Sequence, residues 1–229
     1  MSLAQAALTE KVTIPRYKLP VSREDATTLL TYAYAQEVAC RGFVLSPDDE
    51  TTKSNIDKVS RWLTSDDTKP MLLLYGGVGN GKTTMAKAVI RLCSTLSSTM
   101  RDLSNKIRDE KESHRLYIQS GNIRIPRMYT AQDLAKKAQS NPDELEKIAN
   151  ARFLIIDDLG CEPAVVKNYG TEVTPITDII YKRYEEMSPL IVTTNLTKAD
   201  IRNIYGARVA DRFNEVFDTI GYTSASYRK

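Results

Sequence analysis

The sequence predicts an α/β fold in which a mainly parallel sheet of five strands lies between two layers of helices. Two observations point to this three-layer αβα arrangement. Short runs of uninterrupted apolar residues recur along the chain, and segments of helix length separate them. A strand that is apolar along its whole length is typical of a parallel sheet with both faces covered. The chain has 229 residues, of which 41% are hydrophobic, so it can form one large domain with a sizeable core.

An N-terminal arm and a helix are expected ahead of the sheet. Pro15 and Pro20 disfavour a helix over residues 1–20. Ser22, with an acidic residue three positions later, resembles a capping box and opens an apolar-periodic stretch that ends near Gly42. The predicted order is therefore an extended arm, then a helix, then the alternating part of the chain.

Strands and helices alternate from there to the C-terminus. Apolar runs predict strands at residues 71–75, 125–130, 153–157, 190–194 and 216–222. Apolar spacing predicts helices at residues 52–63, 81–96, around Leu134, and at 143–150, 174–187, 198–205 and 207–213. Residues 101–116 hold charges of both signs in near-equal number, which is typical of either a solvated helix or a mobile loop.

The loop after the first apolar strand fits the pattern G-x-x-x-x-G-K-[ST] at every fixed position. Its glycines let successive backbone N–H groups point at phosphates, and the helix that follows adds its positive end. Lys82 is expected to reach the β- and γ-phosphates, and the Thr83 hydroxyl to ligate Mg²⁺. The residues expected to bind the nucleotide are Gly76, Gly77, Val78, Gly79, Asn80, Gly81, Lys82, Thr83 and Thr84. The pattern predicts a P-loop NTPase with ATP and Mg²⁺ as cofactors.

Two further apolar strands end in polar residues that suit the same site. Asp157 and Asp158 follow the run 153–156, and Asn195 follows the run 190–194. Asp157 is expected to hold the Mg²⁺ shell together with Thr83, and Asp158 to orient or deprotonate the attacking water. Asn195 is expected to hydrogen-bond that water or the γ-phosphate. Either group at a strand end can also be a simple loop start.

Charge, cysteine spacing and the length of the apolar runs indicate which partners and which compartment the protein can have. The formal net charge is +3, which permits contact with nucleic acid without requiring it. The cysteines Cys40, Cys93 and Cys161 have neither metal-site nor disulfide spacing, which is typical of a reducing compartment. No apolar run approaches the length of a membrane span, so we expect no membrane partner and a cytoplasmic location.

The order of these motifs resembles that of the AAA+ ATPases, and more narrowly the DnaC/IstB-type branch of bacterial and phage helicase loaders and transposition helpers. Four stretches carry the resemblance: 157–160 (Asp-Asp-Leu-Gly), 179–184, 205–213 with its Arg-x-x-x-Arg spacing, and 226–228 (Ser-Tyr-Arg). The resemblance covers about residues 50–229, so we treat residues 51–229 as the ATPase core. Residues 1–50, the arm and helix, match no motif and are a candidate partner-binding segment.

The resemblance implies roles for residues that spacing alone would leave as ordinary surface arginines. Arg212 would be an arginine finger acting in the site of a neighbouring subunit, with Arg208 as the alternate, and Arg228 would be a sensor-2 arginine touching the γ-phosphate in its own subunit. A finger in trans implies head-to-tail self-association and an ATPase that is weak without an oligomer or a partner. The short chain after Asn195 leaves no room for a full C-terminal lid domain, as in that branch.

Three alternative functions stay open, and the resemblance implies the first two. The first is a DnaC-like loader, with a hexameric replicative helicase and single-stranded DNA as partners in DNA replication. The second is an IstB-like transposition helper that assembles on duplex DNA. The third is a nucleotide-gated binding module with little hydrolysis, because Asp158 is one methylene shorter than the usual Glu. Two points stay open: whether residues 42–44 form the adenine wall or core, and whether residues 94–122, longer than a simple connection needs, contact DNA or a partner.

Overall fold

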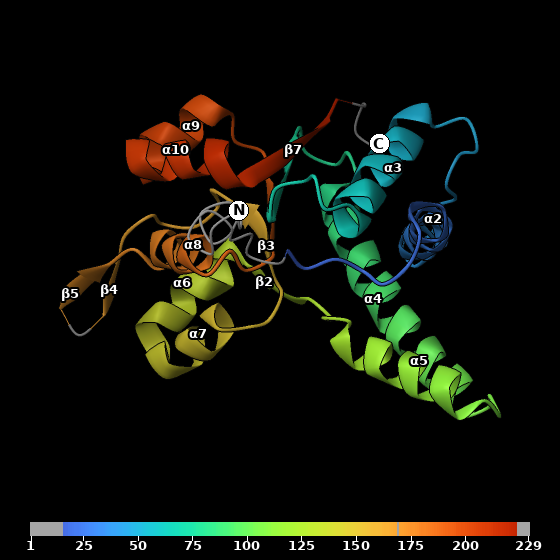
Figure 1. Ribbon diagram of the computed structural model, residues 1–229. Coiled ribbons are helices and arrows are strands. Elements are labelled where there is room, and N and C mark those ends of the chain that lie inside the picture. Colours follow the sequence, from blue (N-terminus) through green and yellow to red (C-terminus); the bar gives the residue numbers. More distant parts are fainter. Residues whose placement is uncertain (1–15, 169, 224–229) are drawn as a thin grey trace, which may run out of the picture.

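The computed structural model describes residues 16–168 and 170–223, and its centre is the predicted five-stranded sheet (Figure 1). The strand order is β2-β3-β6-β1-β7, and every pair in it is parallel. The strands are β1 (Met71–Gly76), β2 (Arg127–Thr130), β3 (Leu154–Leu159), β6 (Leu190–Thr194) and β7 (Phe217–Tyr222). The carboxyl ends of parallel strands lie at one edge of the sheet, so the loops that follow β1, β3 and β6 lie together at that edge.

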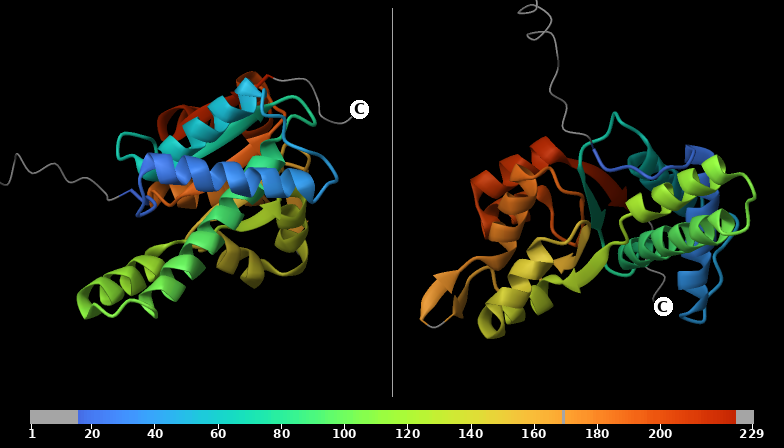
Figure 2. Two further views of the ribbon diagram at one scale, coloured as in Figure 1. Left: turned by 90° about the vertical axis from the view of Figure 1, so that its right-hand side faces the viewer. Right: turned by 60° about the horizontal axis from the view of Figure 1, so that its bottom comes forward.

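Helices cover both faces of this sheet, which confirms the predicted three-layer fold (Figures 1 and 2). One face is covered by α2 (Arg23–Ala39), α3 (Glu50–Thr64) and α4 (Lys82–Ser104). The other is covered by α6 (Ala131–Ser140), α7 (Pro142–Ala149), α8 (Pro175–Glu185), α9 (Lys198–Tyr205) and α10 (Ala207–Val216). Within the described residues, the chain after β6 forms only α9, α10 and β7, and no separate helical lid.

The apolar strands divide their side chains between the two layers because successive residues of a strand point to opposite faces. In β1, Leu72 and Leu74 pack with α2, α3 and α4, whereas Met71 and Leu73 pack in the core of the opposite layer. All four are at most 3% exposed. Burial of both faces explains why these strands are continuously apolar rather than alternating.

Helix α2 belongs to the same packed layer as the phosphate-loop helix. Its Leu30, Ala33 and Tyr34 are buried in one cluster with residues of α3 and α4. Ahead of it, the side chain of Arg16 donates to the carbonyls of Ser65 (2.6 Å) and Trp62 (2.5 Å). These contacts fix the described part of the arm to the end of α3.

The charged stretch that was expected to be a solvated helix or a mobile loop is mainly helical. Helix α4 continues to Ser104 because Leu92, Leu96 and Met100 extend its buried stripe at intervals of four residues. A turn follows, and α5 (Glu110–Asn122) packs back along α4 as a hairpin that projects from the body of the molecule (Figure 2). Its amino end is capped by the Asp109 carboxylate, which accepts from the N–H of Glu112 (2.8 Å).

A small antiparallel ribbon, β4 (Val166–Asn168) with β5 (Thr171–Val173), lies between β3 and α8 and was not predicted. Each strand has three residues, too few to give a periodicity signal. Val166 is 4% exposed and packs against Ala135 and Ala138 of α6, which anchors the ribbon. None of the described helices is long and apolar enough to cross a membrane.

Candidate functional site

The loop between β1 and α4 forms a tight cradle at the carboxyl edge of the sheet. Gly76 and Gly81 have φ angles of +140° and +95°, which a residue with a side chain rarely adopts. A Cβ on Gly76 would overlap the Tyr222 carbonyl oxygen, and a Cβ on Gly81 would overlap the Tyr34 hydroxyl. The two glycines are therefore required both by backbone conformation and by the close approach of β7 and α2. The loop gives backbone N–H groups at the amino end of α4, which suits a phosphate.

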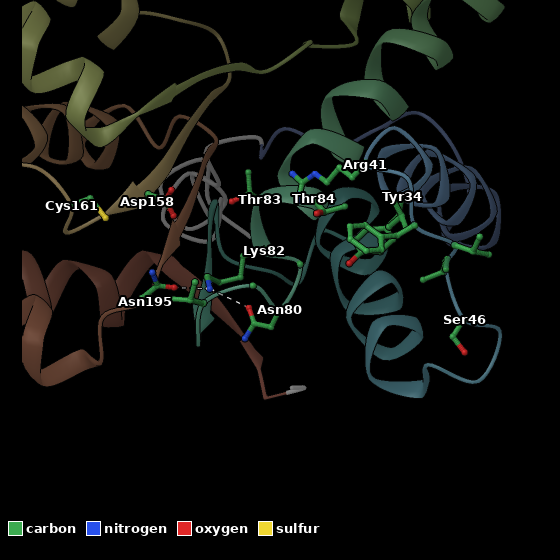
Figure 3. A pocket seen from close by; sticks show the side chains of 17 residues that line it. Tyr34, Arg41, Ser46, Asn80, Lys82, Thr83, Thr84, Asp158, Cys161 and Asn195 are labelled. Atoms are coloured by element: carbon green, nitrogen blue, oxygen red, sulfur yellow. Dashed lines mark hydrogen bonds between the residues drawn. The ribbon is translucent and has the colours of Figure 1, made fainter. Parts of the chain in front are cut away.

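Lys82 lies inside this cradle, with its ammonium group held by four oxygens. Its Nζ donates to the carbonyls of Gly76 (2.9 Å) and Gly77 (2.7 Å). It also donates to the side-chain oxygens of Asn80 (3.2 Å) and Asn195 (2.8 Å) (Figure 3). Burial lowers the pKa of Lys82, and the nearby carboxylates of Asp158 and Asp157 oppose that effect. The structure thus places Asn195, which follows β6, at the phosphate loop.

Thr83 and Asp157 also meet at this edge of the sheet. The Thr83 hydroxyl donates to Asp157 Oδ1 (3.0 Å), and the Thr193 hydroxyl of β6 donates to the same oxygen (2.5 Å). Asp157 is 5% exposed, so its carboxylate is fixed by two donors in a mostly buried place. Thr193 was not singled out from the sequence, because a threonine inside a buried strand gives no signal of its own.

An irregularity in the pairing of β3 changes the direction in which the Asp158 side chain points. The pairing of β3 with β6 shifts register between Ile156 and Leu159, and Asp158 has a φ of +55°. Its backbone N–H donates to the Thr193 hydroxyl (2.9 Å). A β-bulge changes the direction in which a side chain points, and such bulges are frequent beside active sites. Asp157 therefore faces Thr83, whereas Asp158 lines the neighbouring cavity.

A cavity of about 420 Å³ extends from the phosphate loop to the end of α2 (Figure 3). Lys82, Thr83, Asp158, Asn195 and the loop 78–81 line one side. The opposite wall comes from α2 and the segment after it: Tyr34, Val38, Arg41, Phe43, Val44, Leu45 and Ser46. Two residues suggested for the adenine wall, Phe43 and Val44, are among them. The remaining members were missed because no motif marks them.

Two of the predicted arginines, Arg208 and Arg212, are not among the described residues that line this cavity in their own chain. The Arg212 guanidinium lies between two rings of α8, with Cζ 4.5 Å from the Tyr181 centroid and 4.6 Å from the Tyr184 centroid. Arg208 is exposed on α10, the helix that also carries Arg212. Arg228 lies outside the described residues.

A buried glutamate that the sequence did not point to lies beyond β3. Glu162 is 7% exposed, and its carboxylate accepts from the N–H of Gly160 (2.9 Å) and from the Tyr205 hydroxyl. Burial, reinforced by the hydrogen bond to Glu162, raises the pKa of Tyr205. The contact joins the loop after β3 to the last residue of α9.

The donor set fits a magnesium nucleotide. One hydroxyl and one carboxylate, Thr83 and Asp157, lie in contact beside the cradle, and Mg²⁺ is typically bound by one or two such groups together with phosphates and water. The described part of the chain has no group of three or more His, Cys, Asp and Glu side chains arranged for a metal ion. The site therefore suits a metal that arrives with phosphate rather than one held by protein ligands alone.

Comparison with known proteins gives a result for structure only. No protein-family model matches the sequence, and no curated protein matches it. The structure is similar to the crystal structure of the DnaC helicase loader, with a TM-score of 0.52 and 18% identity, over 78% of this chain and 94% of that one. It is also similar to the crystal structure of DnaI, with a TM-score of 0.53 and 15% identity, over 93% and 96% of the two chains. The chain thus has the P-loop AAA+ fold, and the resemblance to DnaC-like ATPases is confirmed at the level of the fold.

Proposed function

We propose that this chain binds ATP with Mg²⁺, hydrolyses it slowly, and acts as a DnaC-like loader of a replicative DNA helicase. One observation supports nucleotide binding above all others. Three residues that are far apart in the sequence converge on one glycine cradle beside a cavity of about 420 Å³: Lys82 at the start of α4, Asp157 in β3 and Asn195 directly after β6. That volume suits a small organic ligand of nucleotide size.

Each side chain has a role in this proposal that follows from its position. Lys82 exchanges loop carbonyls and Asn195 for phosphate oxygens, which are better partners for an ammonium group. Thr83 and Asp157 hold the Mg²⁺ that, when bound, neutralises charge developing on the phosphates. Asp158 accepts a proton from, or orients, the attacking water, and Asn195 hydrogen-bonds the water or the γ-phosphate. The apolar wall at Phe43 and Val44 receives the adenine.

The arginines of α10 complete the site from a neighbouring subunit in this proposal. Arg208 and Arg212 lie away from the cavity of their own chain, which supports contribution in trans. A guanidinium near the transferring phosphoryl group is worth about 10³–10⁵ in rate in other systems. The isolated subunit is therefore a weak ATPase, and head-to-tail contact raises its activity.

A mixing experiment tests the trans arrangement. Lys82→Ala removes the phosphate contact but keeps α10 intact, whereas Arg212→Ala keeps the phosphate loop intact. Each variant alone should hydrolyse ATP far more slowly than the wild type, and an equimolar mixture should recover part of the activity. Arg208→Ala takes the place of Arg212→Ala in a parallel mixture, to assign the finger. A mixture that never exceeds the mean of its two components would overturn a contribution in trans.

The loader role rests on likeness along nearly the whole chain, since 93% of it aligns with DnaI, and on no single residue. A hexameric replicative helicase and single-stranded DNA are the proposed partners, and the segment before the core is the proposed grip on the helicase. The test mixes the protein with its host's helicase, ATP and Mg²⁺, and measures the mass of the complex by light scattering after size exclusion.

The variants for this test follow from the fold. Deleting residues 1–50 would also remove α2, which forms a wall of the cavity. A truncation that lacks only residues 1–15 leaves the described fold whole, so it separates helicase binding from nucleotide binding. A complex lost with residues 1–15 places the grip there, and a complex kept by that truncation moves the grip to residues 16–50 or to the core.

The alternative functions predict different outcomes in the same assays. Assembly that depends on duplex length, with no helicase complex, identifies a transposition helper. Tight ATP binding without single-turnover hydrolysis identifies a nucleotide-gated module. Failure to bind ATP–Mg²⁺ in calorimetry overturns the whole proposal.

A further inference from the structure

A buried hydrogen-bonded bridge joins the loop after Asp158 to the helix that leads into the arginines. Glu162 is its centre: one carboxylate oxygen accepts from the Gly160 N–H at 2.9 Å, and the other accepts from the Tyr205 hydroxyl. Glu162 and Tyr205 are 7% and 9% exposed. A carboxylate is costly to remove from water, and two neutral donors offset only part of that cost. Packing alone would be served better by an apolar side chain.

On one side, the bridge fixes the turn that carries Asp158. The Cys161 N–H donates to the Asp158 carbonyl at 3.2 Å, which closes a turn, and Glu162 then binds the N–H of Gly160 inside it. Gly160 has a φ of +98°, and a Cβ there would overlap the Leu196 side chain. The turn is thus tightly enclosed, and its position depends on the hydrogen bond that joins the Glu162 carboxylate to the Tyr205 hydroxyl.

On the other side, the bridge fixes the start of α10. Tyr205 is the last residue of α9, and Gly206 follows it with a φ of +88° before α10 begins at Ala207. Arg208 and Arg212 lie on the first turns of that helix. Tyr205 therefore lies two residues before the first residue of α10, and the hydrogen bond of its hydroxyl helps to set the direction in which α10 leaves α9.

We propose that Glu162 and Tyr205 are positioning residues that set Asp158 and the arginine helix relative to one another. The inference rests on the proposed ATPase function, in which Asp158 acts within the subunit and α10 acts on a neighbour. With the bridge intact, one subunit presents its water-orienting carboxylate and its arginines in a fixed relation. Without it, nucleotide still binds, because no atom of the bridge belongs to the phosphate cradle.

The test removes the bridge with the smallest change available. Tyr205→Phe deletes one hydroxyl and keeps the ring in the core. Tyr17→Phe is the matched control, because the Tyr17 hydroxyl also makes partly buried hydrogen bonds, to the backbone of Arg124, and neither residue lines the cavity. Glu162→Gln is the conservative variant. The amide oxygen can still accept from the Gly160 N–H, and the amide NH₂ can donate to the oxygen of the Tyr205 hydroxyl.

Three readouts are compared under assembling conditions. We expect Tyr205→Phe to leave the Kd for ATP–Mg²⁺ within about twofold and to lower kcat about tenfold, less than the roughly 10²-fold that a 1 Å misplacement can cost. Glu162→Gln should retain more of kcat than Tyr205→Phe. Hydrogen exchange should become faster in residues 158–162 and in residues 206–212 together, whereas Tyr17→Phe should change neither kcat nor these two segments.

Different failures point to different errors. Faster exchange in only one of the two segments, or a loss of kcat equal to that of Tyr17→Phe, overturns the positioning role. Loss of nucleotide binding in Tyr205→Phe also overturns it, because the bridge would then belong to the binding site. If the wild type does not hydrolyse ATP, the proposed function has failed, and the exchange measurement alone decides whether the bridge couples the two segments. If Tyr205→Phe does not fold, Glu162→Gln carries the same exchange test.

Discussion

Gly81→Ala tests whether α2 is built into the phosphate loop. Gly81 has a φ of +95°, and holding alanine in such a sparsely populated region costs about 1–3 kcal/mol. The added Cβ would also overlap the Tyr34 hydroxyl and lie 3.6 Å from the ring carbon Cζ. Tyr34 is 2% exposed, so it has little room to move. We expect a loss of unfolding free energy greater than the conformational cost alone.

The control separates the two contributions. Gly42 has a φ of +79°, and an added Cβ there would meet nothing within 4 Å, so Gly42→Ala measures the conformational cost without the overlap. Tyr34→Phe removes the overlapping oxygen and leaves Cζ at ordinary contact distance. In the double variant Gly81→Ala/Tyr34→Phe, the two changes should therefore couple favourably by about 0.5–3 kcal/mol.

The assay is urea unfolding of the wild type, the three single variants and the double variant, followed by circular dichroism. The m-value is compared throughout, because a change in it would mean that the transition itself had changed. Two results together would refute the argument that α2 packs directly against the phosphate loop. These are equal losses of unfolding free energy in Gly81→Ala and Gly42→Ala, and zero coupling between Gly81→Ala and Tyr34→Phe.

Three further predictions follow from buried polar groups. Asp157→Asn should keep ATP affinity measured without Mg²⁺ but abolish most of the increase that Mg²⁺ gives, as measured by calorimetry. Arg183→Ala should lower the unfolding free energy by about 2–4 kcal/mol without changing ATP affinity, because the carbonyls of Ala151 and Pro189 lose their buried donor; an unchanged urea midpoint would contradict this. Burial raises the pKa of Cys93 to about 12, so the thiol stabilises the fold fully below its unfolded pKa of about 8.5 and loses that contribution as pH rises. Unfolding free energy should therefore fall by about 2 kcal/mol between pH about 8.5 and 10 from this group, and Cys93→Ala should remove that part of the fall.

The strands and the phosphate loop were predictable because their signals are local. Continuous apolar runs mark strands buried on both faces, and the glycine-lysine-threonine spacing is complete within one loop. The meeting of Asp157 with Thr83 also followed, since the carboxyl ends of parallel strands share one edge of the sheet. These predictions needed no knowledge of which side chains would touch.

What the sequence did not reveal depends on contacts between distant residues. The bulge that turns Asp158 away from Asp157 arises from the register of β3 against β6, and register is not written in either strand alone. Glu162 and Tyr205 are separated by 43 positions, and each alone resembles a surface residue. The same holds for Arg183, which is completely buried although its type is usually exposed.

The described end of the arm determines where mechanical load enters the molecule. Arg16 is held by two carbonyls at the end of α3 and by the Trp62 ring, with its Cζ 4.9 Å from the ring centroid. The Leu19 N–H adds a backbone hydrogen bond to Leu63 at 2.8 Å. A pulling force on the chain ahead of Arg16 therefore acts first on these contacts with α3 and only then on α2. Because α2 forms a wall of the nucleotide cavity, a tether or a surface linkage attached ahead of Arg16 loads that wall only after the contacts with α3.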